Sequence, residues 1–351
     1  MTSPLCYLPN GQLLCYNDGG FFLMQDGEVV QRICFSSSFI ERCQLLNRLL
    51  RKGVRASLAI DNNSVVISFG QTLRELDLQS GLMSKGWGCD NAIRPLTFTN
   101  VTNIEGFSNG IYFGGYLQNK EKKPVSIYHR VGVDQWDVVY TFPSGAINHV
   151  HNILPDPYRQ CLWILTGDFG DSAAIWKVTE GFNKVERFVY GNQKWRGCVA
   201  FAIPEGILYA TDTPFDSNHI YLLREDRSIE MLGDLCGSCI YGCQWNNSFV
   251  FSSTVEADGR DETLMKLMFS KKRGSGIIDD YVRIYMGNLN KGFKEIYKEK
   301  KDFLPFIFQF GAFKFPSGIN NSNTLYFQPV ATNKNSMKLM DINWNALLEN
   351  E

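Results

Sequence analysis

Long apolar runs are absent from this chain of 351 residues, and so is any excess of charge of one sign. No segment reaches the ~18 uninterrupted apolar residues of a membrane-spanning helix, so no membrane association is expected. Lysine plus arginine (35) nearly balance aspartate plus glutamate (36), which argues against the basic surface of a nucleic-acid-binding protein. Histidine is also scarce, with 4 residues in all, so any grouping of histidines is informative.

Several signatures of exported proteins and of common enzymes are missing as well. The first residues lack a basic segment followed by an apolar one, so we expect no signal peptide. The expected location is the cytoplasm, where the 10 cysteines would be reduced thiols. The chain has no Walker loop, no Gly-x-Ser-x-Gly and no His-Glu-x-x-His. Nucleotide-dependent, serine-hydrolase and zinc-protease chemistries therefore have no motif to support them.

What the sequence does contain is a loose repeat of about 45 residues, in which two short apolar strands flank a turn. The copies are 103–116, 149–168, 196–213, 241–256 and 309–330, with a shorter one at 55–70. Such a repeat, in a chain with 13% aromatic residues and little helical patterning, indicates an all-β protein built as a β-propeller. We predict one propeller domain over residues 1–351.

The predicted propeller has seven blades, with six as the alternative if the first and last segments form one blade. Residues 39–52 carry apolar side chains at helical spacing, so a short helical insertion is expected there. A polar excursion at 257–280 is expected to be a surface loop. The predicted blades cover 5–35, 54–87, 95–143, 146–193, 195–237, 238–302 and 305–351.

Three segments resemble the Asp-box of sialidase-like (BNR-repeat) β-propellers, a turn between outer strands with the pattern Ser-x-Asp-x-Gly-x-x-Trp. They are 127–140, 175–188 and 284–297. The first keeps Trp136 but has Val131 at the position of the aspartate. The resemblance covers the central and C-terminal blades. It implies the sialidase-like fold, carbohydrate binding, and glycosidase or lyase activity.

Alignment of the repeats places polar residues around one end of the central channel. A propeller brings equivalent positions of its blades together, and its ligands commonly bind at the channel mouth. The second strands end in this register at Asp168, Asp212 and Glu256. The positions early in the innermost strands are Arg55, Asn103, His149, Arg196, Tyr241 and Gln309.

His149 and His151 are two residues apart on a predicted strand, so both imidazoles should point into the channel. Three interpretations are open for this pair. One is a divalent-metal site completed by a carboxylate such as Asp168 or Glu105. The second is acid–base catalysis near neutral pH, and the third is a structural pair that holds the blades together.

Arg55 and Arg196 are expected to hold an anionic group, because a guanidinium can contact both oxygens of a carboxylate. Asn103 and Gln309 are further candidate ligand contacts. In sialidases, three arginines hold the substrate carboxylate, while a Tyr–Glu pair and an aspartate carry the chemistry. The resemblance implies such roles for Arg94, Tyr241 and Glu256. The family's Arg-Ile-Pro signature is absent from the first blade.

The predicted function is the binding of an anionic or hydroxylated small molecule, a sugar above all, at the channel mouth. The sequence leaves open whether the protein is an enzyme. A pair of carboxylates, Asp168 and Asp171, could act as the acid and base of a glycosidase or could form a tight turn. The alternative function is a non-catalytic scaffold for a protein partner. The candidate catalytic set is His149, His151, Asp168, Asp212, Glu256 and Tyr241, with His149 and His151 also the candidate metal ligands.

Overall fold

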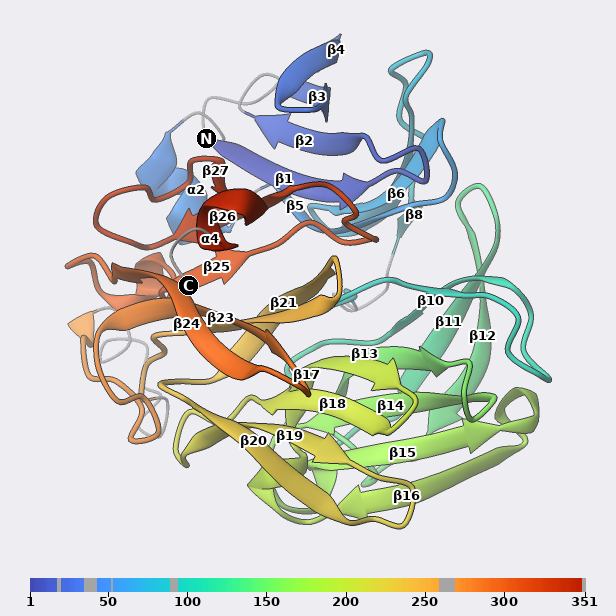
Figure 1. Ribbon diagram of the computed structural model, residues 1–351. Coiled ribbons are helices and arrows are strands. Elements are labelled where there is room, and N and C mark those ends of the chain that lie inside the picture. The colour runs from blue at the N-terminus through green and yellow to red at the C-terminus, as the bar shows by residue number, and fades with distance from the viewer. Residues whose placement is uncertain (18–19, 35–42, 52, 89–93, 259–268, 349–351) are drawn as a thin grey trace.

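The computed structural model describes residues 1–17, 20–34, 43–51, 53–88, 94–258 and 269–348. Their strands form seven antiparallel sheets arranged as the blades of a propeller (Figure 1). The prediction of an all-β, seven-bladed propeller is therefore confirmed. The six-bladed alternative is wrong, because the first and last segments form separate sheets.

Six of the sheets have four strands, and the seventh has three among the described residues. The first three blades contain β1 (Thr2–Tyr7), β2 (Leu13–Asn17), β3 (Gly20–Gln25), β4 (Glu28–Cys34), β5 (Val54–Ala59), β6 (Ser64–Phe69), β7 (Thr72–Asp77), β8 (Trp87–Gly88), β9 (Thr99–Val101), β10 (Gly110–Gly114), β11 (Val125–Gly132) and β12 (Gln135–Phe142). The fourth and fifth contain β13 (His149–Asp156), β14 (Cys161–Gly167), β15 (Ala174–Thr179), β16 (Lys184–Tyr190), β17 (Gly197–Ile203), β18 (Gly206–Thr211), β19 (Asn218–Leu223) and β20 (Ile229–Leu235). The last two contain β21 (Cys239–Trp245), β22 (Ser248–Ser253), β23 (Tyr281–Asn288), β24 (Gly292–Lys300), β25 (Ala312–Lys314), β26 (Thr324–Val330) and β27 (Met340–Asn343).

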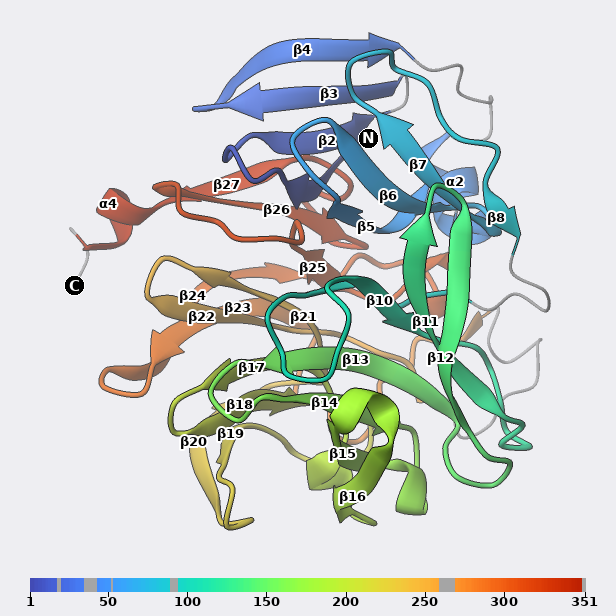
Figure 2. The same cartoon turned by 90° about the vertical axis from the view of Figure 1, so that its right-hand side faces the viewer.

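Burial follows the position of a strand within its blade. Every residue of β14 is buried, because neighbouring blades pack on both faces of this second strand. In β16, on the outer edge of the same blade, exposed residues alternate with more buried ones. Figure 2 shows the same order in the first blade, from β4 at the top edge inward to β3 and β2. The second strands therefore read as continuous apolar runs, whereas the outer strands read as alternating ones.

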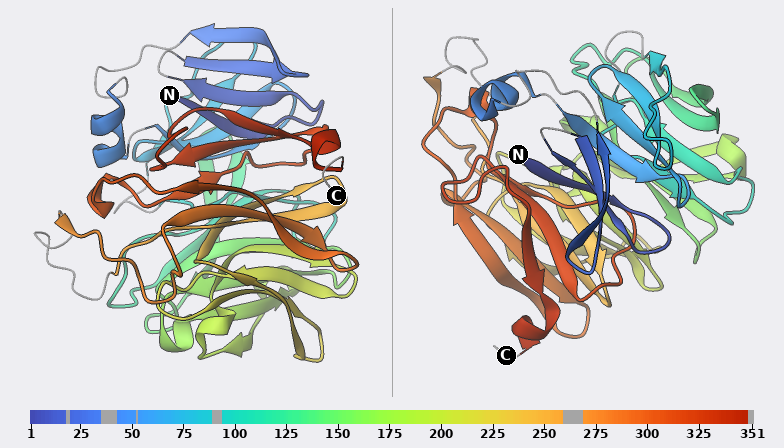
Figure 3. Two further views of the ribbon diagram at one scale, coloured as in Figure 1. Left: turned by 60° about the vertical axis from the view of Figure 1, so that its left-hand side comes forward. Right: turned by 90° about the horizontal axis from the view of Figure 1, so that it is seen from above.

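The ring closes between the first and the last blade. Both views in Figure 3 show these blades, blue and red, side by side. Gln328 Nε2 of β26 donates a hydrogen bond to the Thr2 carbonyl at 2.8 Å, and Cys6 forms a parallel bridge with Ser317. Among the described residues no strand is shared between the two sheets, and such hydrogen bonds together with apolar packing join them.

The helical insertion appears as α2 (Gln44–Leu50), and residues 39–42 of the predicted segment lie outside the described residues. Its Arg48 ties the helix to the last blade, donating to the Phe308 carbonyl at 2.9 Å and pairing with Asp302 at 2.6 Å. A second short helix, α4 (Trp344–Leu348), ends the described chain. No helix of the described chain has the length and apolar character to cross a membrane.

The segments that resemble Asp-boxes form the outer hairpins β11–β12, β15–β16 and β23–β24, as predicted for a turn between outer strands. The excursion at 257–280 lies between β22 and β23, and its residues 259–268 fall outside the described residues.

A β-bulge recurs near the start of the innermost strand in five blades. The bulged residues are Leu5, Arg55, His151, Cys198 and Ile240. A bulge inserts one unpaired residue and turns its side chain away from the regular alternation. The observed register therefore aligns Arg55 with His151 and Cys198, whereas the sequence alignment placed it with His149 and Arg196.

Candidate functional site

Polar side chains from six consecutive blades surround one end of the channel. Most lie at the start of an innermost strand or just after a second strand, the two points that antiparallel pairing brings together. They are Arg55, Tyr116, His149, His151, Asp168, Arg196, Cys198, Asp212, Tyr241, Glu256 and Lys314.

The two histidines are buried at the start of β13 and face each other. His149 Nδ1 lies 2.9 Å from the Leu117 carbonyl, and His151 Nδ1 lies 3.1 Å from the Gly197 carbonyl of the next blade. Their Nε2 atoms are 2.9 Å apart. Burial lowers the pKa of His151, which favours its neutral form.

The bulge at His151 is accommodated by a glycine across the pair of strands. A methyl group on Gly167 would lie 2.3 Å from Cε1 of the His151 ring. Real side chains cannot approach so closely, so glycine at this position creates the space that the imidazole occupies.

Asp168 follows Gly167 directly and joins the histidines to the next blade. Its Oδ1 lies 3.3 Å from His149 Nε2, 3.7 Å from His151 Nε2 and 3.2 Å from an Arg196 guanidinium nitrogen. Burial raises the pKa of Asp168, but the two imidazoles beside it and the charge of Arg196 hold that pKa well below its usual range. The carboxylate is therefore ionised at neutral pH.

Arg196 is enclosed by two carboxylates, since its Nε also lies 3.5 Å from Asp212 Oδ2. The Cys198 thiol donates to the same Asp212 oxygen at 3.3 Å. Burial raises the pKa of Cys198 well above its usual value, so the sulfur stays protonated. On this wall, blades four and five, each cation therefore has an anion beside it.

On the wall made by blades two, three and seven, the cations lie beside aromatic rings and not beside carboxylates of the described residues. Arg55 stacks over Tyr116 at 5.2 Å from the ring centroid, and Lys314 Nζ lies 5.7 Å from the Tyr241 ring. Burial, with the charges of nearby arginines, lowers the pKa of Lys314 to about 8. In the part of the chain that the structure describes, no carboxylate pairs with Arg55, Arg94 or Lys314.

Solvent reaches this second wall although protein surrounds it. Arg55 is exposed and Lys314 is half-buried, yet burial lowers the pKa of both side chains. That combination is expected for side chains that are open to solvent on one side and surrounded by protein on the others. Arg94 adds a buried Nε without a hydrogen-bond partner in the described structure, and its backbone pairs with Tyr116.

Glu256, from blade six, is the last of the polar side chains around this end of the channel. Burial raises its pKa to about 8, with a further contribution from the negative charge of Asp212. At neutral pH this carboxyl group is protonated, whereas Asp168 is ionised. The site therefore holds two carboxyl groups in opposite protonation states.

An aromatic pair lies next to these carboxylates. Phe169 follows Asp168, and its ring stacks on Phe215 with centroids 5.9 Å apart and planes 17° apart. Phe169 is 50% exposed, although the Arg196 guanidinium lies 5.2 Å from its centroid. Phe169 and Phe215 thus form an aromatic platform beside the polar side chains of the channel mouth.

Some predicted site residues lie elsewhere. Asn103 sits in the turn after β9, at the opposite end of blade three, because the innermost strand of this blade begins earlier than the repeat suggested. Glu105 lies at that same end, where its backbone N–H donates to Gln160 in the β13–β14 turn. Asp171 is directed away from Asp168, with Arg187 as its partner at 3.8 Å. Gln309 precedes β25, and none of the described contacts joins its side chain to the ring.

Sequence reasoning missed Tyr116 and Lys314. Tyr116 follows the second strand of its blade, as Asp168 and Asp212 do, so the same alignment rule could have found it. Lys314 is a single charge within the apolar run Ala312–Phe315, which is a signal for a polar position on an innermost strand.

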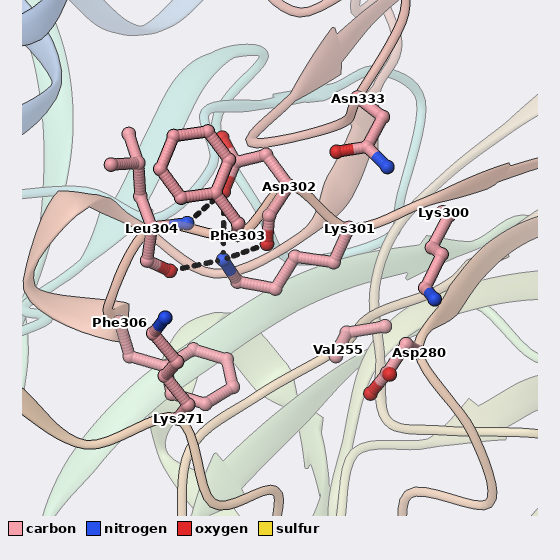
Figure 4. Close-up of a pocket in the computed structure, with 10 residues that line it drawn as sticks. All are labelled: Val255, Lys271, Asp280, Lys300, Lys301, Asp302, Phe303, Leu304, Phe306 and Asn333. Carbon is pink, nitrogen blue, oxygen red and sulfur yellow. Dashed lines mark hydrogen bonds and ion pairs between the residues drawn. The ribbon is translucent and has the colours of Figure 1, made fainter.

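A cavity of about 310 Å³ opens between blades six and seven, and its lining residues are drawn in Figure 4. Lys301 Nζ, which lines the cavity, donates hydrogen bonds to Asp302 Oδ1 at 2.9 Å and to the Leu304 carbonyl at 2.8 Å. None of the predicted site residues lines the cavity, and its buried lysine is already satisfied.

Comparisons with known proteins support the fold only. No protein-family model matches the chain, and no curated protein is significantly similar to it. The extracellular domain of a putative hybrid two-component system from B. thetaiotaomicron matches with a TM-score of 0.58 and 13% identity, over 99% of this chain and 39% of that one. A chain of the mitotic checkpoint complex matches at 0.55 and 8%, over 97% and 87%. The CNH domain of AfRom2 matches at 0.50 and 7%, over 97% and 94%.

These identities are too low to transfer a function, and none of the three proteins is described as a sialidase. The comparisons therefore support the seven-bladed propeller fold, and the resemblance to sialidase-like propellers stays a prediction.

Proposed function

We propose that this propeller binds a carbohydrate that carries a carboxylate, at the mouth of its central channel. The observation that carries the proposal is the group of cations on blades two, three and seven, namely Arg55, Arg94 and Lys314, without a carboxylate partner in the described residues. A positive charge that is partly withdrawn from water, as that of Lys314 is, is costly unless an anion accompanies it.

A carboxylate suits this group by charge and by geometry. A guanidinium donates two parallel hydrogen bonds to the two carboxylate oxygens, and an ammonium adds a third donor. Arg196, the other predicted anion-binding residue, already has Asp168 and Asp212 as partners. We therefore assign the anion to Arg55 and its neighbours, and not to Arg196.

The rest of the ring suits the hydroxylated body of a sugar. The exposed face of Phe169 offers an apolar surface for the C–H groups of a pyranose. Asp168, whose side chain is 32% exposed, offers a carboxylate acceptor for hydroxyl groups. Ligand sites of this kind combine aromatic surface with a few fixed polar groups.

Glycosidase or lyase activity is the second candidate. Its support is the opposite protonation state of two carboxyl groups, Glu256 protonated and Asp168 ionised at neutral pH. An acid–base pair needs this separation of pKa values. His149 and His151 then hold Asp168 in place, and Tyr241 lies beside Glu256.

The binding proposal is tested by calorimetry and thermal shift with uronic acids, sialic acid and the corresponding neutral sugars. A ligand specific for the folded state raises the melting temperature once its concentration exceeds the dissociation constant. We expect acidic sugars to bind and neutral ones not to, and Arg55→Ala to weaken binding by roughly 10- to 100-fold.

The matched control is Arg224→Ala, an arginine paired with Glu230 on the outer part of blade five, which should bind like the wild type. Equal binding of neutral and acidic sugars would contradict the role of the cations. Failure of every sugar to bind would favour the non-catalytic scaffold for a protein partner.

A further inference from the structure

Three atoms that can donate a lone pair converge at the start of β13. We infer that His149 Nε2, His151 Nε2 and Asp168 Oδ1 form a binding site for a divalent transition-metal ion. This inference does not depend on the sugar, because it concerns the charge-paired wall of the channel and not the cations opposite.

The first argument is the protonation of the imidazoles. A backbone carbonyl only accepts hydrogen bonds, so the Nδ1 atoms that contact the Leu117 and Gly197 carbonyls must carry hydrogens. In the neutral form, each Nε2 then has a lone pair and no hydrogen. Two such atoms lie 2.9 Å apart, an arrangement that is repulsive unless a cation lies between them.

The second argument is the geometry. Ligands about 2.1 Å from one ion lie roughly 3.0 Å apart at right angles and about 3.4 Å apart at the tetrahedral angle. The three separations here are 2.9, 3.3 and 3.7 Å. Two imidazoles and one carboxylate are a ligand set that zinc, iron and related divalent ions accept.

The third argument is the surroundings. Metal-bound histidines usually donate their other ring N–H to a carbonyl or a carboxylate, which fixes the ring, and both histidines here do so. Arg196 fixes Asp168 in the same way at 3.2 Å. The histidine side chains are 7% and 1% exposed, whereas that of Asp168 is 32% exposed. The ion would therefore be held from the protein side, and its open positions would face the channel.

A neighbouring group, His151 with Cys198 and Asp212, also has its ligand atoms within reach of one another. It is the weaker candidate because the thiol hydrogen is already donated to Asp212. The remaining alternative for the proposed site is a single shared proton. Such a proton on His149 Nε2 would be donated to His151 Nε2 at 2.9 Å and shared with Asp168 Oδ1 at 3.3 Å, and the metal titration below distinguishes the two arrangements.

The test uses the full chain, stripped of metal by a chelator and titrated with Zn²⁺ and with Co²⁺ at pH 7.5. We expect one equivalent of metal per chain in calorimetry, and cobalt absorption bands typical of nitrogen and oxygen ligands. Asp168→Asn and His149→Gln, which preserve side-chain size, should each weaken binding by more than about 100-fold, beyond the range for residues outside the ligand set.

Two further variants separate coordination from folding. Gly167→Ala keeps all three ligand residues but displaces the His151 ring, so it should also weaken metal binding. His219→Ala removes a histidine paired with Asp234 on blade five and should bind metal like the wild type. The inference is overturned if the stripped wild type binds neither ion at micromolar concentration. It is also overturned if Asp168→Asn, folded by circular dichroism, binds as tightly as the wild type.

Discussion

The two walls of the channel carry similar side chains in opposite electrostatic states. On blades four and five, Arg196 lies between Asp168 and Asp212. On blades two, three and seven, Arg55 and Lys314 have aromatic rings beside them and no carboxylate in the described residues. The charges of the paired wall have counter-charges within the protein, whereas the described residues supply none for the cations of the unpaired wall. Removing a charge should therefore have opposite effects on the two sides.

The largest effect should come from breaking the paired wall. Asp212→Asn leaves Arg196 with one carboxylate, and the two side chains are only 5% and 11% exposed. Loss of one partner of a buried ion pair destabilises a protein by about 3–5 kcal/mol. Urea unfolding at pH 7 measures the change. Asp234→Asn, on the same blade with its side chain 78% exposed, is the control and should cost under about 1 kcal/mol.

The unpaired wall should make binding of a sugar acid depend on pH. Burial lowers the pKa of Lys314 to about 8, so the ammonium is present below that pH and lost above it. The sugar carboxylate stays ionised throughout. Affinity should therefore be constant from pH 6 to 7 and fall by up to about tenfold per pH unit above 8. Calorimetry across this range measures it, and a flat profile in the wild type would contradict the assignment of Lys314.

Removing that charge should stabilise the protein, the reverse of the effect at Asp212. Lys314 has a pKa of about 8 in the folded state against a usual value of 10.5, so the folded state binds its proton less tightly. Lys314→Met should raise the free energy of unfolding at pH 7 by about 1 kcal/mol. The gain should shrink as pH rises from 8 towards 10.5, because the wild type then loses the charge as well.

Denaturant unfolding at several pH values provides this measurement. Lys334→Met, at an exposed lysine, is the matched control and should leave stability nearly unchanged at every pH. Destabilisation by Lys314→Met would show that Lys314 has a stabilising partner and that this wall is not unpaired.

The smallest effect should come from the platform next to the paired wall. Phe169→Ala should weaken sugar binding by roughly 2- to 10-fold, the contribution of one aromatic contact, and should change stability little because the ring is 50% exposed. Tyr158→Ala removes an exposed aromatic ring at the opposite end of blade four and should not change affinity. Equal losses in both variants would place the ligand away from the channel mouth.

Blade boundaries could be predicted because each blade repeats a local pattern. A buried second strand such as β14 reads as an apolar run, and turns follow it, so seven blades could be counted along the chain. In blade three the predicted boundary was right, but the predicted register of the innermost strand was wrong. There the innermost strand is the short β9 (Thr99–Val101), and Asn103 belongs to the turn that follows it.

The register of the site residues could be predicted only in part. His149 and Arg196 start their strands as expected, but the bulge at Arg55 shifts it to the level of His151. A bulge is a property of pairing between two strands, and a single strand's sequence carries little signal for it. Lys314 was missed because the last copy was aligned from Gln309, whereas the innermost strand of that blade, β25, begins at Ala312.

The amino-acid sequence by itself determined the all-β class and the number of blades, because strand formation and turns depend on residues close along the chain. Only the tertiary structure decided which charges are paired and which ring nitrogen of each imidazole carries the hydrogen. Arg196 and Asp168 belong to different blades, as do His151 and the Gly197 carbonyl that holds its Nδ1 hydrogen. Such contacts join residues that are separated along the chain by whole strands, and the packing of neighbouring blades brings them together.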